Sequence, residues 1–177
     1  YHLCKSLLEE GYQVIGVDNL NNYYSLDLKL ARLELLRANK NFIFEKVDIA
    51  NIQSISSIFK KFKPNKVVNL AAQAGVRYSI KNPYAYTNSN ILGFVNLIEL
   101  SRKNNVEGFI YASSSSVYGS SKKTPFSEKD QTDTPVSLYG ASKKSNELIA
   151  AAYYNLYGLK TTGLRYFTVY GPWGRPD

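Results

Sequence analysis

The chain has 177 residues, which is enough for one domain with a sizeable hydrophobic core. Hydrophobic residues make up 44% and charged residues 20%, a composition typical of globular proteins and not of disordered ones. The net charge of +8 could suit nucleic acid, but the lysines lie in short scattered clusters that usually form solvated surface. We therefore predict no nucleic-acid partner.

Several other classes of protein are disfavoured by what the chain lacks. No apolar run approaches the roughly 20 residues that a membrane span requires, so we expect no membrane role. The single cysteine, Cys4, cannot form an internal disulfide, which favours a reducing, cytoplasmic setting. The lone histidine, His2, argues against hydrolases that need a histidine base, and His and Cys are too few for a zinc site, so we predict no metal.

Helical and strand-like patterns alternate along the chain. Predicted helices cover residues 1–11, 25–40, 51–64, 83–104 and about 137–157, and predicted strands cover residues 12–18, 41–49, 65–72, 106–114 and 159–167. Strands rich in Val, Ile and Phe between helices predict an α/β fold with a parallel sheet covered on both faces. The longest irregular segment, residues 119–135, has the length of many functional loops.

Polar and small residues gather where the predicted strands end, which is where open α/β sheets bind ligands. Asp18 ends one strand, and its carboxylate could accept hydrogen bonds from a ribose while repelling a 2′-phosphate, which favours NAD over NADP. Asp48 and Ile49 end the next strand and could reach an adenine. The run "NLAAQAG", residues 69–75, would let the backbone approach a cofactor closely. An ordinary turn aspartate and plain packing of small residues remain the alternatives.

A dinucleotide fold also needs a glycine-rich turn between its first strand and first helix, and the chain contains none. It contains no methionine, opens inside a predicted helix and closes on "TVYGPWGRPD". We therefore expect residues 1–177 to be a partial Rossmann-type domain, a doubly wound parallel sheet without its first strand. We expect a C-terminal substrate domain to lie outside the chain.

The stretch "VSLYGASKKSNELIA" places Tyr139 four residues before Lys143, so the two side chains point the same way on a helix. An ammonium beside a phenol favours the phenolate and makes tyrosine a usable base. With 15 tyrosines and 22 Lys and Arg residues, chance is the alternative. The run "YASSSSVYG" ends a predicted strand, where its hydroxyls could bind a sugar hydroxyl or form a polar turn.

Six motifs in order resemble those of the extended short-chain dehydrogenase/reductase family of nucleotide-sugar enzymes. They are "GVDN", "VVNLAAQAGVRYS", "NILGFVNLIE", "YASSSSVYG", "SLYGASKKSNE" and "YFTVYGPWGRPD". The resemblance covers essentially the whole chain, and the motifs look most like those of UDP-glucuronate 4-epimerases. It implies NAD as cofactor and a UDP-sugar as substrate.

The resemblance also implies roles for individual residues. Tyr139, Lys143 and Ser114 match the catalytic triad, and Ser116 matches a second hydroxyl contact. NAD contacts are implied for Asp18, Asn19, Asp48, Ile49, Leu70, Ala71, Ala72, Gln73, Ser89, Tyr139, Lys143, Tyr166 and Phe167. Substrate contacts are implied for Arg77, Ser114, Ser115, Thr168 and Arg175.

The reaction implied is the conversion of UDP-glucuronate to UDP-galacturonate by transient oxidation at C4, with Tyr139 as base. Sugar 4,6-dehydratases of the same family carry an Asp-Glu pair where this chain has Ser115 and Ser116, which cannot serve as general acid and base near neutral pH. UDP-glucose 4-epimerase is the closer rival, but it typically has asparagine at the position of Thr168. Arg77 or Arg175 could pair with a substrate carboxylate.

An alternative of another class is that the chain is a catalytically incompetent fragment, because a sheet without its central strand has unpaired edges. The resemblance also allows a homodimer through the helix that carries Tyr139 and the helix at residues 83–104. The sequence does not determine the oligomeric state.

Overall fold

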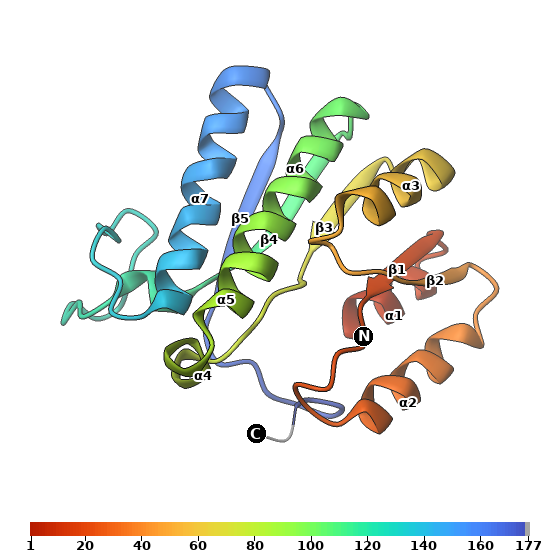
Figure 1. Ribbon diagram of the computed structural model, residues 1–177, viewed down its shortest axis with the longest axis horizontal. Helices are drawn as coiled ribbons and strands as arrows, with labels where there is room; N and C mark the ends of the chain where they lie inside the picture. The colour runs from red at the N-terminus through yellow and green to blue at the C-terminus, as the bar shows by residue number, and fades with distance from the viewer. Residues whose placement is uncertain (176–177) are drawn as a thin grey trace. The chain divides into compact units, whose positions relative to one another are not determined.

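The computed structural model describes residues 1–175, which form two compact units. The first unit contains residues 1–48 and the segment that begins at Thr168, and the second unit contains residues 49–167. Both units consist of parallel strands and helices (Figure 1). The expectation of an α/β, Rossmann-type fold is confirmed, whereas the assignment of the chain to one partial domain stays a prediction.

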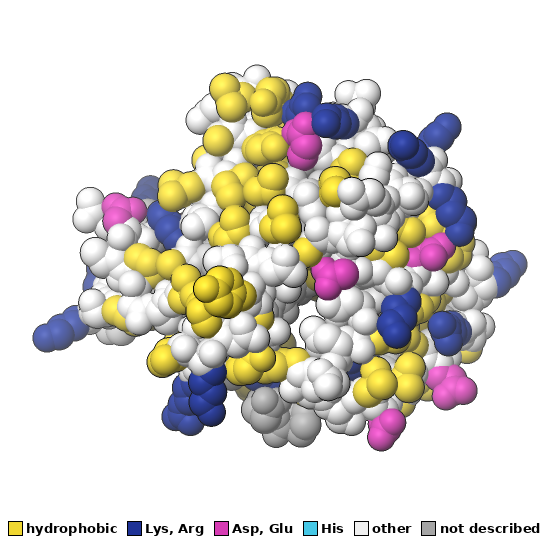
Figure 2. All heavy atoms as spheres, in the orientation of Figure 1, with side chains coloured by type: hydrophobic (Ala, Val, Ile, Leu, Met, Phe, Trp, Pro, Cys, Tyr) yellow, Lys and Arg dark blue, Asp and Glu magenta, His cyan; other side chains and the backbone are white. Residues whose placement is uncertain are grey.

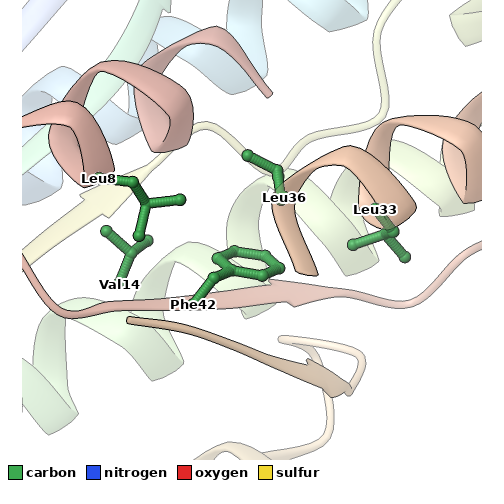
Figure 3. Close-up of a cluster of buried hydrophobic side chains, with 5 residues drawn as sticks. All are labelled: Leu8, Val14, Leu33, Leu36 and Phe42. Atoms are coloured by element: carbon green, nitrogen blue, oxygen red, sulfur yellow. The ribbon is translucent and has the colours of Figure 1, made fainter. Parts of the chain in front are cut away.

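The first unit contains the elements α1 (His2–Glu9), β1 (Val14–Asp18), α2 (Leu26–Arg37) and β2 (Phe42–Lys46). Strand β1 pairs with β2 in parallel, with Val14 opposite Phe42. Leu8 from α1 and Leu33 and Leu36 from α2 surround these two strand residues in a buried cluster (Figure 3). Burial of this apolar face holds the helices onto the strands.

The segment that begins at Thr168 belongs to the first unit because its backbone carbonyls accept hydrogen bonds there. A guanidinium nitrogen of Arg32, on α2, donates to the carbonyl of Trp173 at 2.5 Å. The His2 ring nitrogen bonds the carbonyl of Pro172 at 2.8 Å, and the guanidinium of Arg175 lies 5.6 Å from the centre of the Tyr23 ring. Pro172 and Trp173 of this segment are therefore attached to α1 and α2.

The second unit is built on three parallel strands in the order β3-β4-β5. Its elements are α3 (Ile52–Phe62), β3 (Lys66–Asn69), α4 (Val76–Lys81), α5 (Pro83–Tyr86), η1 (Thr87–Leu92), α6 (Gly93–Lys103), β4 (Gly108–Ser114), η2 (Ser115–Tyr118), α7 (Leu138–Tyr157) and β5 (Thr161–Tyr166). Helices α6 and α7 lie side by side over one face of this sheet (Figure 1). Phe94 of α6 packs edge-on against Phe109 and Tyr111 of β4, which forms the core between helix and sheet.

Every predicted strand and helix is present in the structure. A Rossmann sheet has the strand order 3-2-1-4-5-6. The pair β1-β2 of this structure has the connectivity of Rossmann strands 2 and 3, and β3-β4-β5 has that of Rossmann strands 4, 5 and 6. The short helix α4 and the single turn η2 were not predicted. Elements of four to six residues are too short for a helical repeat to show in the sequence.

The helix predicted over residues 83–104 is the main difference. It is helical throughout, but η1 interrupts it with wider, π-type turns between α5 and α6. Such turns are rare and occur frequently at functional sites. Asn90, which lies inside η1, is buried and uses its side chain to bond segments outside the helix.

No helix within residues 1–175 combines the length and the apolar character that crossing a membrane would require. In the same part of the chain, no three His, Cys, Asp or Glu side chains come together in a group that could hold a metal ion.

An ion-pair cluster joins α6 to α7. The Glu99 carboxylate accepts hydrogen bonds from Arg102 at 2.9 and 2.6 Å and from the Tyr153 hydroxyl at 3.0 Å, and Lys103 lies 3.2 Å away. The hydrogen bonds from Arg102 are the main reason that the pKa of Glu99 falls from its ordinary 4.5 to about 2. The cluster therefore depends on an ionised carboxylate.

We expect this cluster to make the fold sensitive to acid. Because folding lowers the pKa of Glu99, its contribution to stability is complete above pH 4.5 and is lost as the pH falls toward about 2. Melting temperatures measured between pH 5 and pH 2 should fall less steeply for Glu99→Gln than for the wild type. Glu107→Gln, at an exposed carboxylate, is the control and should keep the wild-type slope. Equal slopes for all three proteins would contradict the assignment.

Candidate active site

Helix α7 begins beside the serine run. Its N-cap residue, Ser137, accepts a hydrogen bond from the backbone N–H of Gly140 at 3.0 Å. A Cβ atom at Gly140 would lie 2.8 Å from the carbonyl oxygen of Ser116, so only glycine lets the first turn of α7 pack this closely on η2. Tyr139 precedes this glycine, so its backbone belongs to the turn of α7 that packs on η2.

Lys143 follows one turn later and is buried, with 4% of its surface exposed. Its ammonium donates a hydrogen bond of 2.8 Å to the carbonyl of Ala112, two residues before Ser114. Burial lowers the pKa of Lys143 from 10.5 to about 8, because the interior disfavours the charged form. The cation of the predicted pair thus lies at the carboxyl end of β4.

Ser114 is the last residue of β4 and is buried. Its hydroxyl accepts a hydrogen bond from the backbone N–H of Ser116 at 3.1 Å and so caps η2. Ser115 and Ser116, in that turn, are half-buried. The serine run is therefore a strand end followed by a turn, and that turn packs on α7.

The Tyr139 ring contacts a second tyrosine. Tyr86 is fully buried and meets Tyr139 edge-on, with ring centres 6.2 Å apart and planes at 76°. The Tyr86 hydroxyl donates to the carbonyl of Ala74 at 2.8 Å and also bonds the carbonyl of Gly75. Tyr86 thus connects the segment after β3 with the half-buried ring of Tyr139.

Most of the other positions matched to NAD contacts also belong to the second unit. Leu70 and Ala71 follow β3 and are exposed, Ala72 is half-buried, and Gln73 is buried. Ser89 is half-buried in η1, and Tyr166 and Phe167 are exposed at the end of β5. Ile49 is buried and packs against Gly93 of α6. The two residues are so close that a Cβ atom at Gly93 would lie 2.6 Å from the Ile49 side chain.

Asp18, Asn19 and Asp48 belong to the first unit. The exposed Asp18 carboxylate accepts a hydrogen bond from the backbone N–H of Leu20 at 2.6 Å. The Asn19 side chain donates to Asp48 at 2.9 Å, which ties together the segments that follow β1 and β2. These three polar residues therefore lie at the carboxyl ends of paired parallel strands, as a ribose-binding site requires.

The positions matched to substrate contacts are divided between the units. Ser114 and Ser115 lie beside α7, and Arg77 is exposed on α4, all in the second unit. Thr168 and Arg175 are exposed and belong to the first unit.

A partly buried ion pair between α7 and β5 was missed by the sequence analysis. Arg165 of β5 donates two hydrogen bonds to the Glu147 carboxylate of α7, at 2.8 and 2.9 Å, and the Ser113 hydroxyl donates to the same carboxylate at 2.6 Å. Arg165 also donates to the Tyr118 hydroxyl at 3.2 Å and the Glu128 carbonyl at 3.3 Å. This bidentate pair ties α7 to β4 and β5 and holds the loop after η2.

Asn90, Ser142 and Asn146 were also missed. All three are polar and nearly fully buried, and buried polar groups need hydrogen-bond partners. The sequence holds a signal for Asn90 alone, which is that an asparagine opens the mainly apolar helical pattern "NILGFVNLIEL".

The family model described as GDP-mannose 4,6 dehydratase matches residues 1–176. The chain belongs to this family. This match confirms the resemblance to extended short-chain dehydrogenases/reductases. Within this family, the chain carries serine at positions 115 and 116.

Curated relatives of this family member are similar along nearly all of its length. "Protein CapI" of Staphylococcus aureus is 57% identical over 99% of this chain, and the match covers 52% of that protein. "UDP-glucuronate 4-epimerase 4" of Arabidopsis thaliana is 52% identical over 99% of this chain and 40% of that protein. The chain spans about half the length of the curated relatives it matches.

A solved structure has the same fold. The UDP-glucuronic acid 4-epimerase of Bacillus cereus, in complex with UDP-glucuronic acid and NAD, matches with a TM-score of 0.89 and 35% identity. The match covers 99% of this chain and 55% of that one.

Proposed function

We propose that the gene product carrying this chain is an NAD-dependent nucleotide-sugar 4-epimerase that interconverts UDP-glucuronate and UDP-galacturonate. One observation carries the proposal. The first turn of α7 packs on the end of the serine run at Gly140, while the buried Lys143 ammonium reaches the carbonyl of Ala112 on the adjacent strand. The helical turn that carries Tyr139, the serine turn η2 and the Lys143 ammonium thus all lie near the carboxyl end of β4, which supports the proposed triad. The names of the relatives support the reaction class.

The residues present fit NAD. Asp18 is an exposed carboxylate at the carboxyl end of β1, suited to ribose hydroxyls and unsuited to a 2′-phosphate. Leu70 and Ala71 are exposed where β3 ends, and their small neighbours leave room for a cofactor near the backbone. We assign Asp18, Asn19, Asp48, residues 70–73, Ser89, Lys143, Tyr166 and Phe167 to cofactor binding. NAD, when bound, supplies reversible oxidation of the sugar at C4.

In the mechanism that we propose, Tyr139 accepts the proton of the sugar 4-hydroxyl and returns it when the alcohol is restored on the other face. Ser114 holds the same hydroxyl by a hydrogen bond, with Ser116 as a second contact. Lys143 supplies a positive charge one helical turn from the phenol and favours its ionised form. The sugar begins and ends at the same oxidation level, so no external oxidant is required.

Dehydration is not part of the proposal, although the matching family model is described by a dehydratase activity. Elimination of water needs an acid and a base besides the tyrosine, and the two positions after Ser114 carry only serine hydroxyls. An aliphatic serine hydroxyl is too weak an acid and too weak a base for this role near neutral pH. The serine turn η2 therefore favours epimerisation.

The choice of UDP-glucuronate rests on the segment that follows β5. Thr168 and Arg175 flank the "VYGPWG" run, and a guanidinium can bind a sugar carboxylate through two parallel hydrogen bonds. The uncharged UDP-glucose offers no such group. UDP-glucose 4-epimerisation is the second candidate, which the shared triad would support equally well.

The assay is incubation of the purified gene product with UDP-glucuronate, with UDP-galacturonate separated by chromatography. We expect interconversion without net reduction of added NAD. Arg175→Gln should raise the KM for UDP-glucuronate by roughly 10- to 100-fold, because loss of one charge-assisted bond costs about 1.5 to 3 kcal/mol. Arg77→Gln makes the same change at the other candidate arginine and serves as the matched control. We expect it to change the KM for UDP-glucuronate little.

The outcomes separate the alternatives. If only UDP-glucose and UDP-galactose interconvert, the carboxylate assignment is wrong and the second candidate stands. If Arg77→Gln raises the KM and Arg175→Gln does not, the carboxylate contact belongs to α4. A folded gene product that interconverts neither pair would contradict the proposed function, whereas an active gene product with an inactive fragment of residues 1–177 would support the catalytically incompetent alternative for that fragment.

A homodimer and a cytoplasmic location stay predictions. Figure 2 shows hydrophobic side chains gathered over the part of the surface formed by α5 to α7. The exposed apolar residues of these elements include Tyr84, Leu92, Leu148 and Leu156. An apolar surface on these helices supports the expected pairing of two copies.

A further inference from the structure

We propose that Asn90 and Ser142 are positioning residues, which hold the turn that carries Tyr139 at a fixed place against residues 70–73. The proposal rests on the proposed function, since those two segments would carry the base and part of the cofactor site. It adds two residues to which neither the motifs nor the comparisons assign a role.

Asn90 clamps the backbone of Gln73. Its side-chain oxygen accepts a hydrogen bond from the Gln73 N–H at 2.8 Å, and its side-chain nitrogen donates to the Gln73 carbonyl at 3.1 Å. Asn90 is 2% exposed, so water does not compete for these groups. An amide group that satisfies both backbone groups of one residue fixes the position of that residue. Gln73 is thereby held where the segment after β3 turns toward α4.

The same asparagine reaches the catalytic helix. Its side-chain nitrogen also donates to the Ser142 hydroxyl at 3.0 Å, and Ser142 in turn donates to the carbonyl of Tyr139 at 2.8 Å. Two hydrogen bonds therefore connect η1 to the backbone of the proposed base. Ser142 is itself buried, at 4% exposed.

A further bond holds Asn90 from the other side. The Asn146 side chain, one turn beyond Ser142 on α7, donates to the backbone carbonyl of Asn90 at 2.6 Å. The wide turns of η1 divert this carbonyl from the regular helical pattern, and Asn146 provides its partner. The side-chain amide, the backbone carbonyl and the serine hydroxyl thus form one closed network.

The ends of this network distinguish positioning from general stabilisation. Its bonds end on the N–H and carbonyl of Gln73 and on the carbonyl of Tyr139, which belong to the two segments that would meet the reactants. A displacement of about 1 Å of a reacting group at such a site can lower the rate strongly. We therefore expect the network to affect turnover and not only folding.

The test compares two serine-to-alanine variants of α7 in the full gene product. The Ser142 and Ser145 hydroxyls both donate to a carbonyl about one turn earlier, that of Tyr139 at 2.8 Å and that of Ala141 at 2.9 Å. Only Ser142 also accepts from Asn90. We expect Ser142→Ala to lower kcat by about 5- to 10-fold, the effect of one net hydrogen bond, with KM and bound NAD unchanged. Ser145→Ala should keep the wild-type kcat.

A second arm uses Asn90→Ala, which removes the clamp on Gln73 as well. This variant should lower both kcat and the NAD retained after gel filtration. If the two residues act through one bridge, the double variant should have the kcat of Asn90→Ala alone. Melting temperatures show that each protein is folded at the assay temperature.

Each outcome has one meaning. A Ser142→Ala protein that melts earlier but keeps the wild-type kcat overturns the inference and leaves the network a structural role. Equal losses of kcat in Ser142→Ala and Ser145→Ala also overturn it. Absence of epimerisation in the wild type would instead contradict the proposed function. In that case, faster hydrogen exchange at the Gln73 N–H in Ser142→Ala than in Ser145→Ala would still support the bridge, and equal rates would refute it.

Discussion

Replacing Tyr139 with phenylalanine is expected to lower the kcat of epimerisation by about 10²- to 10⁴-fold, the range that general acid–base groups contribute. The variant loses only the hydroxyl, so the ring keeps its edge-on contact with Tyr86 and the first turn of α7 keeps its packing at Gly140. We expect the melting temperature and the bound NAD to stay at their wild-type values. Initial rates with UDP-glucuronate measure the effect.

The control for this variant is Tyr154→Phe. Tyr154 lies on the same helix but is 59% exposed, so loss of its hydroxyl should leave kcat unchanged. A Tyr139→Phe protein with full activity would remove the proton-transfer role and with it the proposed mechanism.

Removing the charge of Lys143 is expected to be the second large effect. Lys143→Gln should lower kcat by about 10²-fold or more, because no cation then remains one helical turn from the phenol. In the wild type the same charge is lost as the pH rises through about 8, since burial lowers the pKa of Lys143 from 10.5 to that value. Activity should therefore fall above about pH 8, and this decline should be absent in Lys143→Gln.

Stability moves in the opposite direction over that interval. Because the folded state binds the proton of Lys143 less tightly than the unfolded state, the contribution of Lys143 makes folding more favourable between about pH 8 and pH 10.5. Loss of folded protein on deprotonation of Lys143 therefore cannot explain the expected decline in rate. Lys144→Gln, which removes the neighbouring ammonium that bonds Thr132, is the control and should keep the decline. An unchanged wild-type rate up to pH 10 would contradict the role of the Lys143 cation.

Much of the fold follows from local patterns. The leucine spacing of residues 25–40 and the apolar runs before Asp18 and Ser114 predicted α2, β1 and β4, because such patterns are formed by residues close together in the chain. The four-residue spacing of Tyr139 and Lys143 likewise predicted that both lie on one helix, and α7 contains both. The roles of these residues stay predictions.

Other features could not be seen in the sequence. Ser142 and Ser145 are three residues apart on α7, and nothing in their neighbourhood distinguishes them. Glu147 and Arg165 form a bidentate pair between α7 and β5, which no local pattern in the sequence indicates. The two units could not be predicted either, because they depend on which strands pair with one another.

The sequence by itself determined the order of helices and strands and indicated the family, since both depend on residue types at short spacings. Only the tertiary structure decided which polar groups meet in the interior. Asn90, inside the wide turns of η1, bonds partners 17, 52 and 56 positions away. Contacts at such separations arise from chain packing, which local periodicity does not encode.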